Sequence, residues 1–230
     1  MPRKSVSKGK CAYCNHLFSL KALELHLMEH LTNMESSSPE NKSRDYNYIL
    51  VEHYDMFLHL LVKSEAKMEV IDKFLRDIWL ECCNHMSEFT NPDFKISMSH
   101  IVQEIFYPQA KIEYKYDFGT TTHLTLQQLK NYKLSLHENI VLLSRNEPNK
   151  ILCTKCKVEE AVNICIICNM EHEALFCEKC SEEHAKECED FAEYACAPVV
   201  NSPRMGVCGY EGGQIDVERD RNLKKSKSNK

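Results

Sequence analysis

Between residues 45 and 148, apolar and polar residues alternate over residues 111–116 and 121–126, with the period of two that β-strands show. Residues 46–51 and 56–62 are instead rich in apolar and aromatic side chains, which also favour strands. The expected strands are residues 46–51, 56–62, 111–116, 121–126 and 139–143. Between the third and the fourth lies Asp117-Phe118-Gly119, so a β-hairpin with glycine at its turn is predicted there.

The period changes between residues 68 and 89, where apolar residues recur every three or four positions. This spacing predicts one long amphipathic helix, which Asn91-Pro92 would end. The apolar positions are Ile71, Phe74, Leu75, Ile78, Cys82, Met86 and Phe89. Strands, a helix and then more strands predict an α+β domain over residues 45–148.

Composition separates this domain from the rest of the chain. Residues 1–34 contain a cysteine pair and then a histidine pair, and the polar residues 35–44 predict a flexible linker. Residues 151–210 form a Cys-rich segment with nine of the thirteen cysteines, and the charged residues 215–230 predict a disordered tail. We therefore expect an α+β fold in which a central domain is flanked by two small zinc-binding modules.

The unusual feature of the composition is its 13 cysteines and 11 histidines among 230 residues. We expect a cytoplasmic protein, where thiols stay reduced and clustered cysteines bind metal instead of forming disulfides. The odd number of cysteines also does not suit a fully paired disulfide framework. No run of eighteen apolar residues is present, and the basic start of the chain does not resemble a secretory signal, so no membrane association is expected.

The strongest chemical signal is a series of four ligand pairs between residues 151 and 188. The pairs are Cys153 and Cys156, Cys165 and Cys168, Cys177 and Cys180, and His184 and Cys188. Two such pairs complete one tetrahedral zinc site, so the eight ligands predict two zinc ions. A redox Cys-x-x-Cys motif or an iron–sulfur site is the alternative explanation, which three such pairs followed by a histidine disfavour.

Ligand pairs that lie this close in sequence usually interleave, which decides how we share them between the ions. One ion would take Cys153, Cys156, Cys177 and Cys180. The other would take Cys165, Cys168, His184 and Cys188. Sequential pairing of neighbouring knuckles is the alternative topology.

This segment resembles the B-box and related cross-brace zinc modules. The matching stretches are residues 161–168 (AVNICIIC), residues 175–180 (LFCEKC) and His184, whereas Cys188 stands where a B-box usually has a histidine. The resemblance covers about forty residues and implies protein binding. Residues 153–188 fit this function because they hold eight Glu against four Lys, and seven thiolates with two zinc ions would add a charge of −3.

A second metal signal lies in the first thirty residues and resembles a C2H2 zinc finger. Its ligands would be Cys11, Cys14, His26 and His30. Eleven residues separate the two pairs where twelve are usual, and Phe18 and Leu23 stand where such a finger has its small core. A helix with two histidines beside an unrelated cysteine pair is the alternative. With this site, we expect three zinc ions per chain.

The finger has few residues suited to reading DNA. Ser19, Ala22 and Leu25 occupy the base-contacting positions, and none of them is the Arg, Asn or Gln that pairs with a base edge. Leu25, Leu27 and Met28 are expected to offer apolar surface instead. A finger that binds protein or packs within the molecule is the better prediction.

The segment 45–148 resembles a plasmid family called ORF-three-like, named from an Ri plasmid. The matching stretches are residues 83–89 (CNHMSEF), which contain the pattern H-x-x-E-F, and residues 112–119 (IEYKYDFG). Thr120 follows where the family often has an aromatic residue. The resemblance implies an α+β fold and a frequent setting in mobile elements, and it implies no established activity.

Charge and the remaining motifs set the functional alternatives. Residues 1–30 carry a net charge of +3, residues 219–230 carry +5, and the rest of the chain carries −13. We predict a zinc-binding adaptor that contacts a protein partner. The first alternative is a nucleic-acid-associated protein of a mobile element, bound weakly and without sequence preference through the basic ends.

The second alternative is an enzyme with a site near His85, Asp117 and His123. No nucleophile motif or phosphate-binding loop supports it, and the zinc sets are filled by four protein ligands, as structural sites are. Cys82 and Cys83 are interpreted as buried thiols, and Cys196 and Cys208 as spare thiols that could complete a zinc site.

Overall fold

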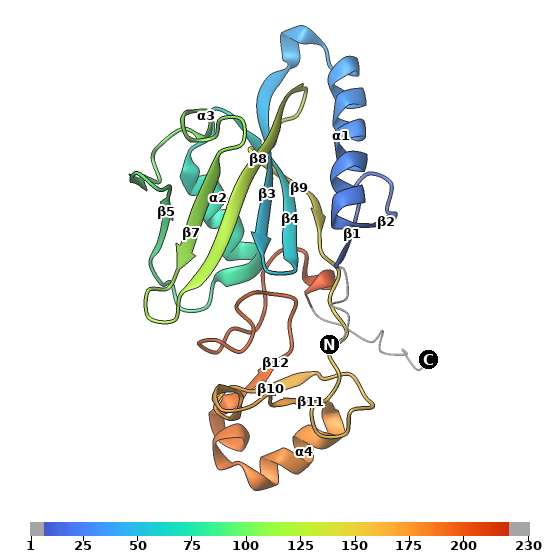
Figure 1. Ribbon diagram of the computed structural model, residues 1–230, viewed down its shortest axis with the longest axis vertical. Coiled ribbons are helices and arrows are strands. Elements are labelled where there is room, and N and C mark those ends of the chain that lie inside the picture. The colour runs from blue at the N-terminus through green and yellow to red at the C-terminus, as the bar shows by residue number, and fades with distance from the viewer. Residues whose placement is uncertain (1–6, 221–230) are drawn as a thin grey trace. The chain divides into compact units, whose positions relative to one another are not determined.

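The computed structural model of the protein describes residues 7–220 (Figure 1). These residues form two compact units, one of residues 7–75 and 86–147, the other of residues 76–85 and 148–220. Among the described residues, no helix is long and apolar enough to cross a membrane. The structure is a mixed α+β fold, as the sequence predicts.

The first unit contains three helices and nine strands within the described residues. They are β1 (Lys8–Lys10), β2 (Leu17–Ser19), α1 (Leu20–Ser37), a 3₁₀ turn (Glu40–Lys42), β3 (Arg44–His53), β4 (Met56–Lys63), α2 (Met68–Leu75), β5 (Ser87–Thr90), β6 (Lys95–Ile96), α3 (Val102–Ile105), β7 (Lys111–Tyr116), β8 (Thr122–Leu134) and β9 (Ile140–Arg145). All five predicted strands are present, as β3, β4, β7, β8 and β9.

A seven-stranded antiparallel sheet organises this unit, in the order β6-β5-β7-β8-β3-β4-β9. β3 and β4 have six consecutive buried residues each, so both faces of these strands are covered. α1 packs on one face through a core of leucine and tyrosine side chains. α2 lies behind β7 and β8 in the view of Figure 1.

The N-terminal module (β1, β2 and α1) belongs to this core. Leu23, Leu27 and Leu31 repeat every four residues on one face of α1, and all three are fully buried in the cluster that contains Tyr46 and Tyr48. The expectation that Leu27 lies on the surface is therefore wrong, whereas Leu25 is 64% exposed. The apolar face of the helix packs within the molecule.

Gly9 in β1 lies at the closest contact of the N-terminal module with the sheet. A Cβ atom there would lie 2.8 Å from Leu23 and 2.8 Å from Phe57, too close for either side chain. The backbone near Gly9 also contacts the sheet, because the N–H of Ala12 donates to the carbonyl of Leu143 on β9. Glycine therefore allows the hairpin to approach the core.

The segment predicted to be a flexible linker, residues 35–44, has regular structure instead. It contains the last turn of α1, the 3₁₀ turn and the start of β3. Glu35 accepts a hydrogen bond from the N–H of Lys133 at 2.6 Å, and the hydroxyl of Ser38 accepts one from the N–H of Ser135. These contacts hold the segment against β8, which its composition did not reveal.

The predicted helix over residues 68–89 is too long. α2 ends at Leu75, a π-helical turn (Arg76–Leu80) follows it, and the pattern H-x-x-E-F falls on a turn and on β5. The guanidinium of Arg76 donates to Glu81 and to the carbonyl of His85, which folds the chain back. Phe89 then pairs with Tyr114 across β5 and β7. This pairing buries Phe89 in the sheet, although its sequence spacing fits a helix.

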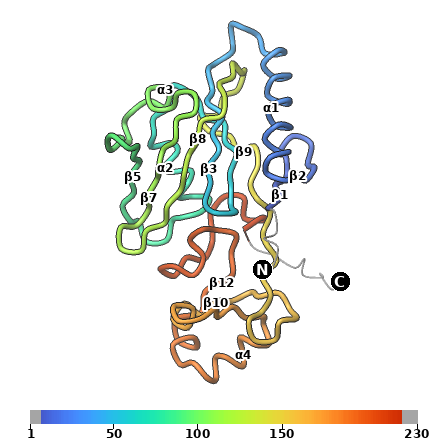
Figure 2. Tube along the Cα trace, viewed as in Figure 1, coloured from blue at the N-terminus to red at the C-terminus, as the bar shows by residue number. Residues whose placement is uncertain are grey.

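The second unit is built from small elements, whose course is visible in Figure 2. They are the π-helical turn (Arg76–Leu80), β10 (Asn163–Cys165), a 3₁₀ turn (Cys168–Met170), β11 (Leu175–Phe176), α4 (Glu178–Glu187), a π-helical turn (Phe191–Ala195), β12 (Cys196–Pro198) and a 3₁₀ turn (Val217–Arg219). The strands pair antiparallel in the order β11-β10-β12. We call residues 151–198 the Cys-rich module. Of the predicted disordered tail, residues 215–220 carry the last 3₁₀ turn, and residues 221–230 lie outside the described residues.

Candidate metal centres

The N-terminal module brings its four predicted ligands together. The ligand atoms of Cys11, Cys14, His26 and His30 all lie within 4.8 Å of one another. The two cysteines lie in the turn between β1 and β2, and the two histidines stand one turn apart on the same face of α1. The hairpin and the helix together therefore form one ligand set.

The separations in this set suit a single metal ion. Nε2 of His26 lies 3.1 Å from Sγ of Cys14 and 3.1 Å from Nε2 of His30. A tetrahedral zinc ion with bonds of about 2.0–2.3 Å holds its ligand atoms about 3.3–3.8 Å apart, so a small outward shift of these side chains would admit the ion. The ring of Phe18 stacks on His26 with centroids 4.2 Å apart, which fixes the orientation of the imidazole.

One Cys-x-x-Cys pair in each module is held in the same backbone turn. Asn15 follows Cys14 with φ 61°, and its N–H donates to the carbonyl of Cys11 at 2.9 Å. Lys157 follows Cys156 with φ 59°, and its N–H donates to the carbonyl of Cys153 at 2.9 Å. The turn places both thiols of a Cys-x-x-Cys pair on one side of the chain.

The eight predicted ligands of the Cys-rich module form two interleaved sets. One set is Cys153, Cys156, Cys177 and Cys180, and the other is Cys165, Cys168, His184 and Cys188. Within each set the ligand atoms lie within 4.8 Å of one another. The grouping is the cross-brace arrangement and not the sequential alternative.

The sulfur atoms in these sets are spaced as metal ligands and not as disulfides. Sγ of Cys168 lies 3.8 Å from Sγ of Cys188 and 3.6 Å from Nε2 of His184. Sγ of Cys156 lies 4.0 Å from Sγ of Cys177. A disulfide bond is about 2.05 Å long, so each of these pairs consists of separate thiols.

Helix α4 links the two sets. Cys177 precedes its first turn and Cys180 lies within that turn, so both belong to the first set. His184 lies one turn further on and Cys188 ends the helix, so both belong to the second set. The helix buries only Cys180 and Ser181, so apolar packing contributes little to its position.

Burial and crowding set the ionisation of these thiols. Burial and the neighbouring thiols Cys165 and Cys188 raise the pKa of Cys168 to about 12. The N–H of His16, helped by nearby imidazoles, lowers the pKa of Cys14 to about 5. Thiolates held this close together repel one another, so a bound cation is the natural way to neutralise them.

The sequence reading missed a fourth set in the second unit. It consists of Cys82, Cys83, His85 and Cys208, whose ligand atoms also lie within 4.8 Å of one another. The structure therefore shows four Cys/His clusters that could hold metal ions. The interpretation of Cys82 and Cys83 as buried thiols is wrong, since Cys83 is exposed and Cys82 is half-buried. The sequence predicts that Cys208 could complete a metal site, but it does not reveal the partners of this cysteine.

The three residues of the predicted catalytic site make separate local contacts. Nδ1 of His123 lies 2.9 Å from a carboxylate oxygen of Glu113. Asp117 accepts a hydrogen bond from the N–H of Gly119 at 2.9 Å inside the hairpin turn. Nε2 of His85 lies 3.3 Å from Sγ of Cys208. None of these contacts links one of the three residues to another.

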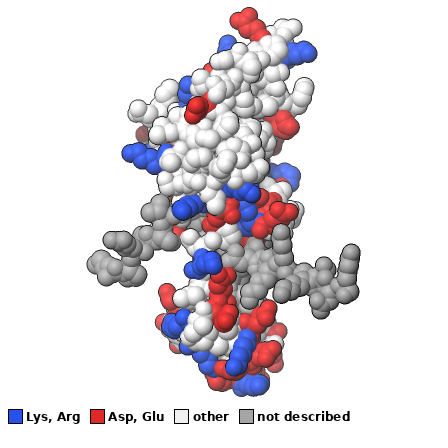
Figure 3. Space-filling model, turned by 90° about the vertical axis from the view of Figure 1, so that its right-hand side faces the viewer, with Lys and Arg blue, Asp and Glu red and all other residues white. Residues whose placement is uncertain are grey.

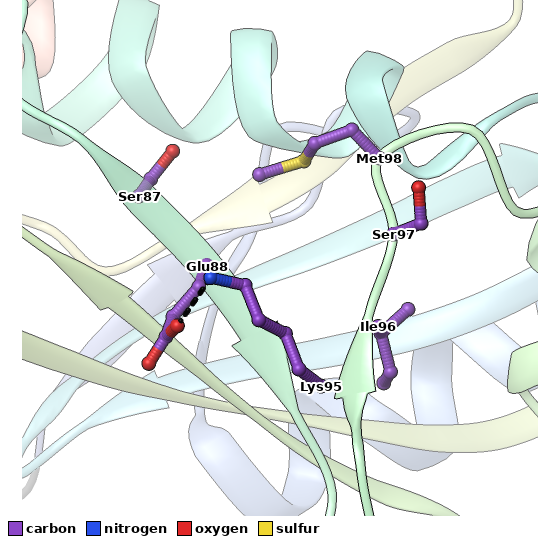
Figure 4. Close-up of a pocket in the computed structure, with 6 residues that line it drawn as sticks. All are labelled: Ser87, Glu88, Lys95, Ile96, Ser97 and Met98. Carbon is purple, nitrogen blue, oxygen red and sulfur yellow. Dashed lines mark ion pairs between the residues drawn. The ribbon is translucent and has the colours of Figure 1, made fainter.

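A surface pocket lies at the edge of the sheet, between β5 and β6 (Figure 4). Its lining consists of Ser87, Glu88, Lys95, Ile96, Ser97 and Met98. Nζ of Lys95 lies 2.9 Å from a carboxylate oxygen of Glu88, so the two charges neutralise each other. The lining contains none of the three residues predicted for catalysis.

Comparisons with known proteins give only a distant structural similarity. No family model and no curated protein matches the chain. A protein of unknown function from Methanosarcina mazei Go1, MM3350, is similar to part of it in its crystal structure. That similarity has a TM-score of 0.37 at 15% sequence identity and covers 44% of this chain and 67% of the other.

Proposed function

We propose that the chain is a zinc-binding protein-interaction protein whose zinc ions are structural. The three predicted ligand sets would bind one zinc ion each. Thiolate and imidazole groups are the ligands of structural zinc, and four protein ligands per ion leave no position open for a catalytic water. The composition of these sets is the observation that carries the proposal. The cytoplasmic location and the resemblance to the plasmid family belong to the same proposal.

The surface of the Cys-rich module favours a protein partner over nucleic acid. Figure 3 shows many acidic side chains, with basic ones among them, on the surface of this module. Residues 153–188 contain eight Glu and four Lys, and the zinc-bound thiolates would add further negative charge. Phosphate groups would be repelled at short range, whereas a basic protein surface would be attracted.

Large apolar side chains of the Cys-rich module are also exposed. Val158 is 75% exposed, Met170 is 77% exposed and Tyr194 is 65% exposed. Large apolar and aromatic groups supply most of the binding energy at protein interfaces. A partner with basic residues around an apolar patch would fit this combination.

Charge reversal on the module tests the proposal. The double substitution Glu171→Lys and Glu182→Lys changes two exposed residues that are not ligands. Glu40→Lys with Glu65→Lys makes the same change in net charge on the first unit and serves as the control. Partners captured from the source cells would be compared by quantitative mass spectrometry, with elemental analysis of zinc in each sample.

The proposal predicts partners that the wild type and the control capture and the module variant loses, with zinc content unchanged. The same three proteins would be titrated into a labelled DNA duplex at two salt concentrations. Tight, sequence-selective binding at physiological salt would overturn the proposal in favour of the nucleic-acid alternative. A zinc content below two ions per chain, or coloured protein that contains iron, would overturn the metal assignment.

A further inference from the structure

The fourth Cys/His cluster has the geometry of a metal site in its own right. Sγ of Cys83 lies 3.7 Å from Sγ of Cys208, and Nε2 of His85 lies 3.3 Å from the same sulfur. These are the edge lengths of a tetrahedron around zinc, about 3.3–3.8 Å. The Sγ–Sγ distance is far longer than a disulfide bond of about 2.05 Å.

The chain turns sharply on both sides of the cluster to bring the ligands together. Asn84, directly after Cys83, has φ 55°, the left-handed conformation that Asn15 and Lys157 adopt after Cys14 and Cys156. Cys208 itself has φ 51° and is followed by Gly209 at φ 65°. Ligands that are 123 residues apart in sequence thereby face one centre.

The two segments that carry the ligands are joined by further contacts. The hydroxyl of Ser202 donates to the carbonyl of Trp79 at 2.6 Å, and the N–H of Gln214 donates to the carbonyl of Asp77 at 2.6 Å. A Cβ atom at Gly213 would overlap the carbonyl oxygen of Ile78, so the backbones approach closely there. The cluster therefore lies at one end of a hydrogen-bonded contact between residues 76–85 and 200–215.

A buried arginine beside this cluster would balance the negative charge of a zinc-loaded site. Arg204 is fully buried, and Nη2 of its guanidinium lies 3.7 Å from Sγ of Cys82. Three thiolates with one Zn²⁺ carry a net charge of −1, which a guanidinium balances. The guanidinium of an arginine can donate hydrogen bonds to zinc-bound thiolates and keeps its charge when it is buried.

We propose that Cys82, Cys83, His85 and Cys208 bind a fourth zinc ion, separate from the three of the proposed function. Three sulfur ligands and one nitrogen ligand select a borderline-soft divalent cation, and four protein ligands make the site structural. The ion pins the turn after α2 to residues 200–210. Because Cys83 and Cys208 are exposed, this ion is the first that a weak chelator removes.

Native mass spectrometry of the full chain, purified without added metal, counts the ions. The wild type should carry four zinc ions and Cys208→Ser should carry three. Cys196→Ser removes another exposed cysteine that belongs to none of the four clusters, so this control should keep four. Three ions in both the wild type and Cys208→Ser would overturn the fourth site and leave the proposed function standing. Fewer than two ions in the wild type would overturn both.

Thiol labelling of the wild type gives a second readout that needs no variant. Cys83, Cys196 and Cys208 are all exposed, so iodoacetamide can reach each of them. If a metal ion binds the cluster, Cys196 should react at least tenfold faster than Cys83 and Cys208, and a chelator should abolish the difference. Equal labelling of the three cysteines before chelation would overturn the site.

Discussion

The two compact units bury different kinds of atoms. In the first unit, the cluster between α1 and the sheet consists mainly of leucine and tyrosine side chains from five elements. In the Cys-rich module, four of the eight buried residues of the main cluster are cysteines of the two ligand sets. The first unit therefore has apolar area to stabilise it, whereas the module depends on its ligands.

This contrast explains why similar metal clusters should have different structural roles. In the N-terminal module, Leu23, Leu27 and Leu31 attach α1 to the sheet independently of its two histidines. In the Cys-rich module, α4 buries little besides a ligand. Loss of metal should thus loosen the first module and unfold the second.

The largest expected effect follows from breaking one ligand set of the Cys-rich module. In Cys177→Ser we expect loss of both zinc ions of the module, because α4 carries ligands of both sets. Structural zinc contributes about 10–16 kcal/mol of apparent binding free energy in small domains, far more than this module's core can replace. The zinc count and the near-ultraviolet circular dichroism measure the effect. If Cys177→Ser lost one ion only and kept the fold, the two sets would be independent.

A core substitution in the first unit should have the opposite pattern. Leu61 on β4 is fully buried in the cluster beneath α1, so Leu61→Ala should lower the free energy of unfolding by about 2–5 kcal/mol. Zinc content of the Cys-rich module should not change. Leu25→Ala removes the same atoms from an exposed position of α1 and should change stability by less than about 0.5 kcal/mol. Denaturant unfolding followed by a signal from the sheet checks both values.

A smaller effect concerns pH and the buried His59 of β4. Burial lowers the pKa of His59 from its ordinary value of 6.5 to about 3, and Tyr48 shares a hydrogen bond with its Nδ1 at 2.8 Å. Below pH 6.5, His59 therefore binds a proton in the unfolded chain but stays neutral in the folded unit. The free energy of unfolding then falls as the pH decreases from 6.5 towards 3. Between pH 7.5 and 5 the loss from this residue should be about 2 kcal/mol.

His59→Phe removes this titration and should flatten the pH dependence by that amount, whereas Tyr48→Phe should keep it. The comparison cancels acid loss of zinc, which affects all three proteins alike. Equal slopes in the wild type and in His59→Phe would show that His59 does not control the acid sensitivity of the sheet.

The sequence predicted the features that depend on residues close together along the chain. The strands β7 and β8 follow from local alternation, β3 and β4 follow from local apolar and aromatic richness, and the three ligand sets follow from short spacings. The helix after Met68 was overestimated because a helical period also fits residues that a turn and β5 take up. Pairing of Phe89 with Tyr114 is a long-range contact that no local pattern contains.

The fourth cluster was missed for the same reason. Cys82 and Cys83 are adjacent and show no ligand spacing, and their partner Cys208 is more than 120 residues away. Only the fold, through the contacts of Ser202 and Asp77, brings them together. The burial of Leu27 likewise depends on tyrosines of β3 that the helix sequence cannot reveal.

The central claim is that metal ions hold the Cys-rich module and that an apolar core holds the sheet. Hydrogen exchange of the full chain, measured by mass spectrometry before and after a strong chelator, tests it most directly. We expect exchange over residues 151–198 to rise to the rate of an unfolded chain, while β3 and β4 remain protected. Continued protection of α4 without metal, or simultaneous loss of protection in β3 and β4, would contradict the account.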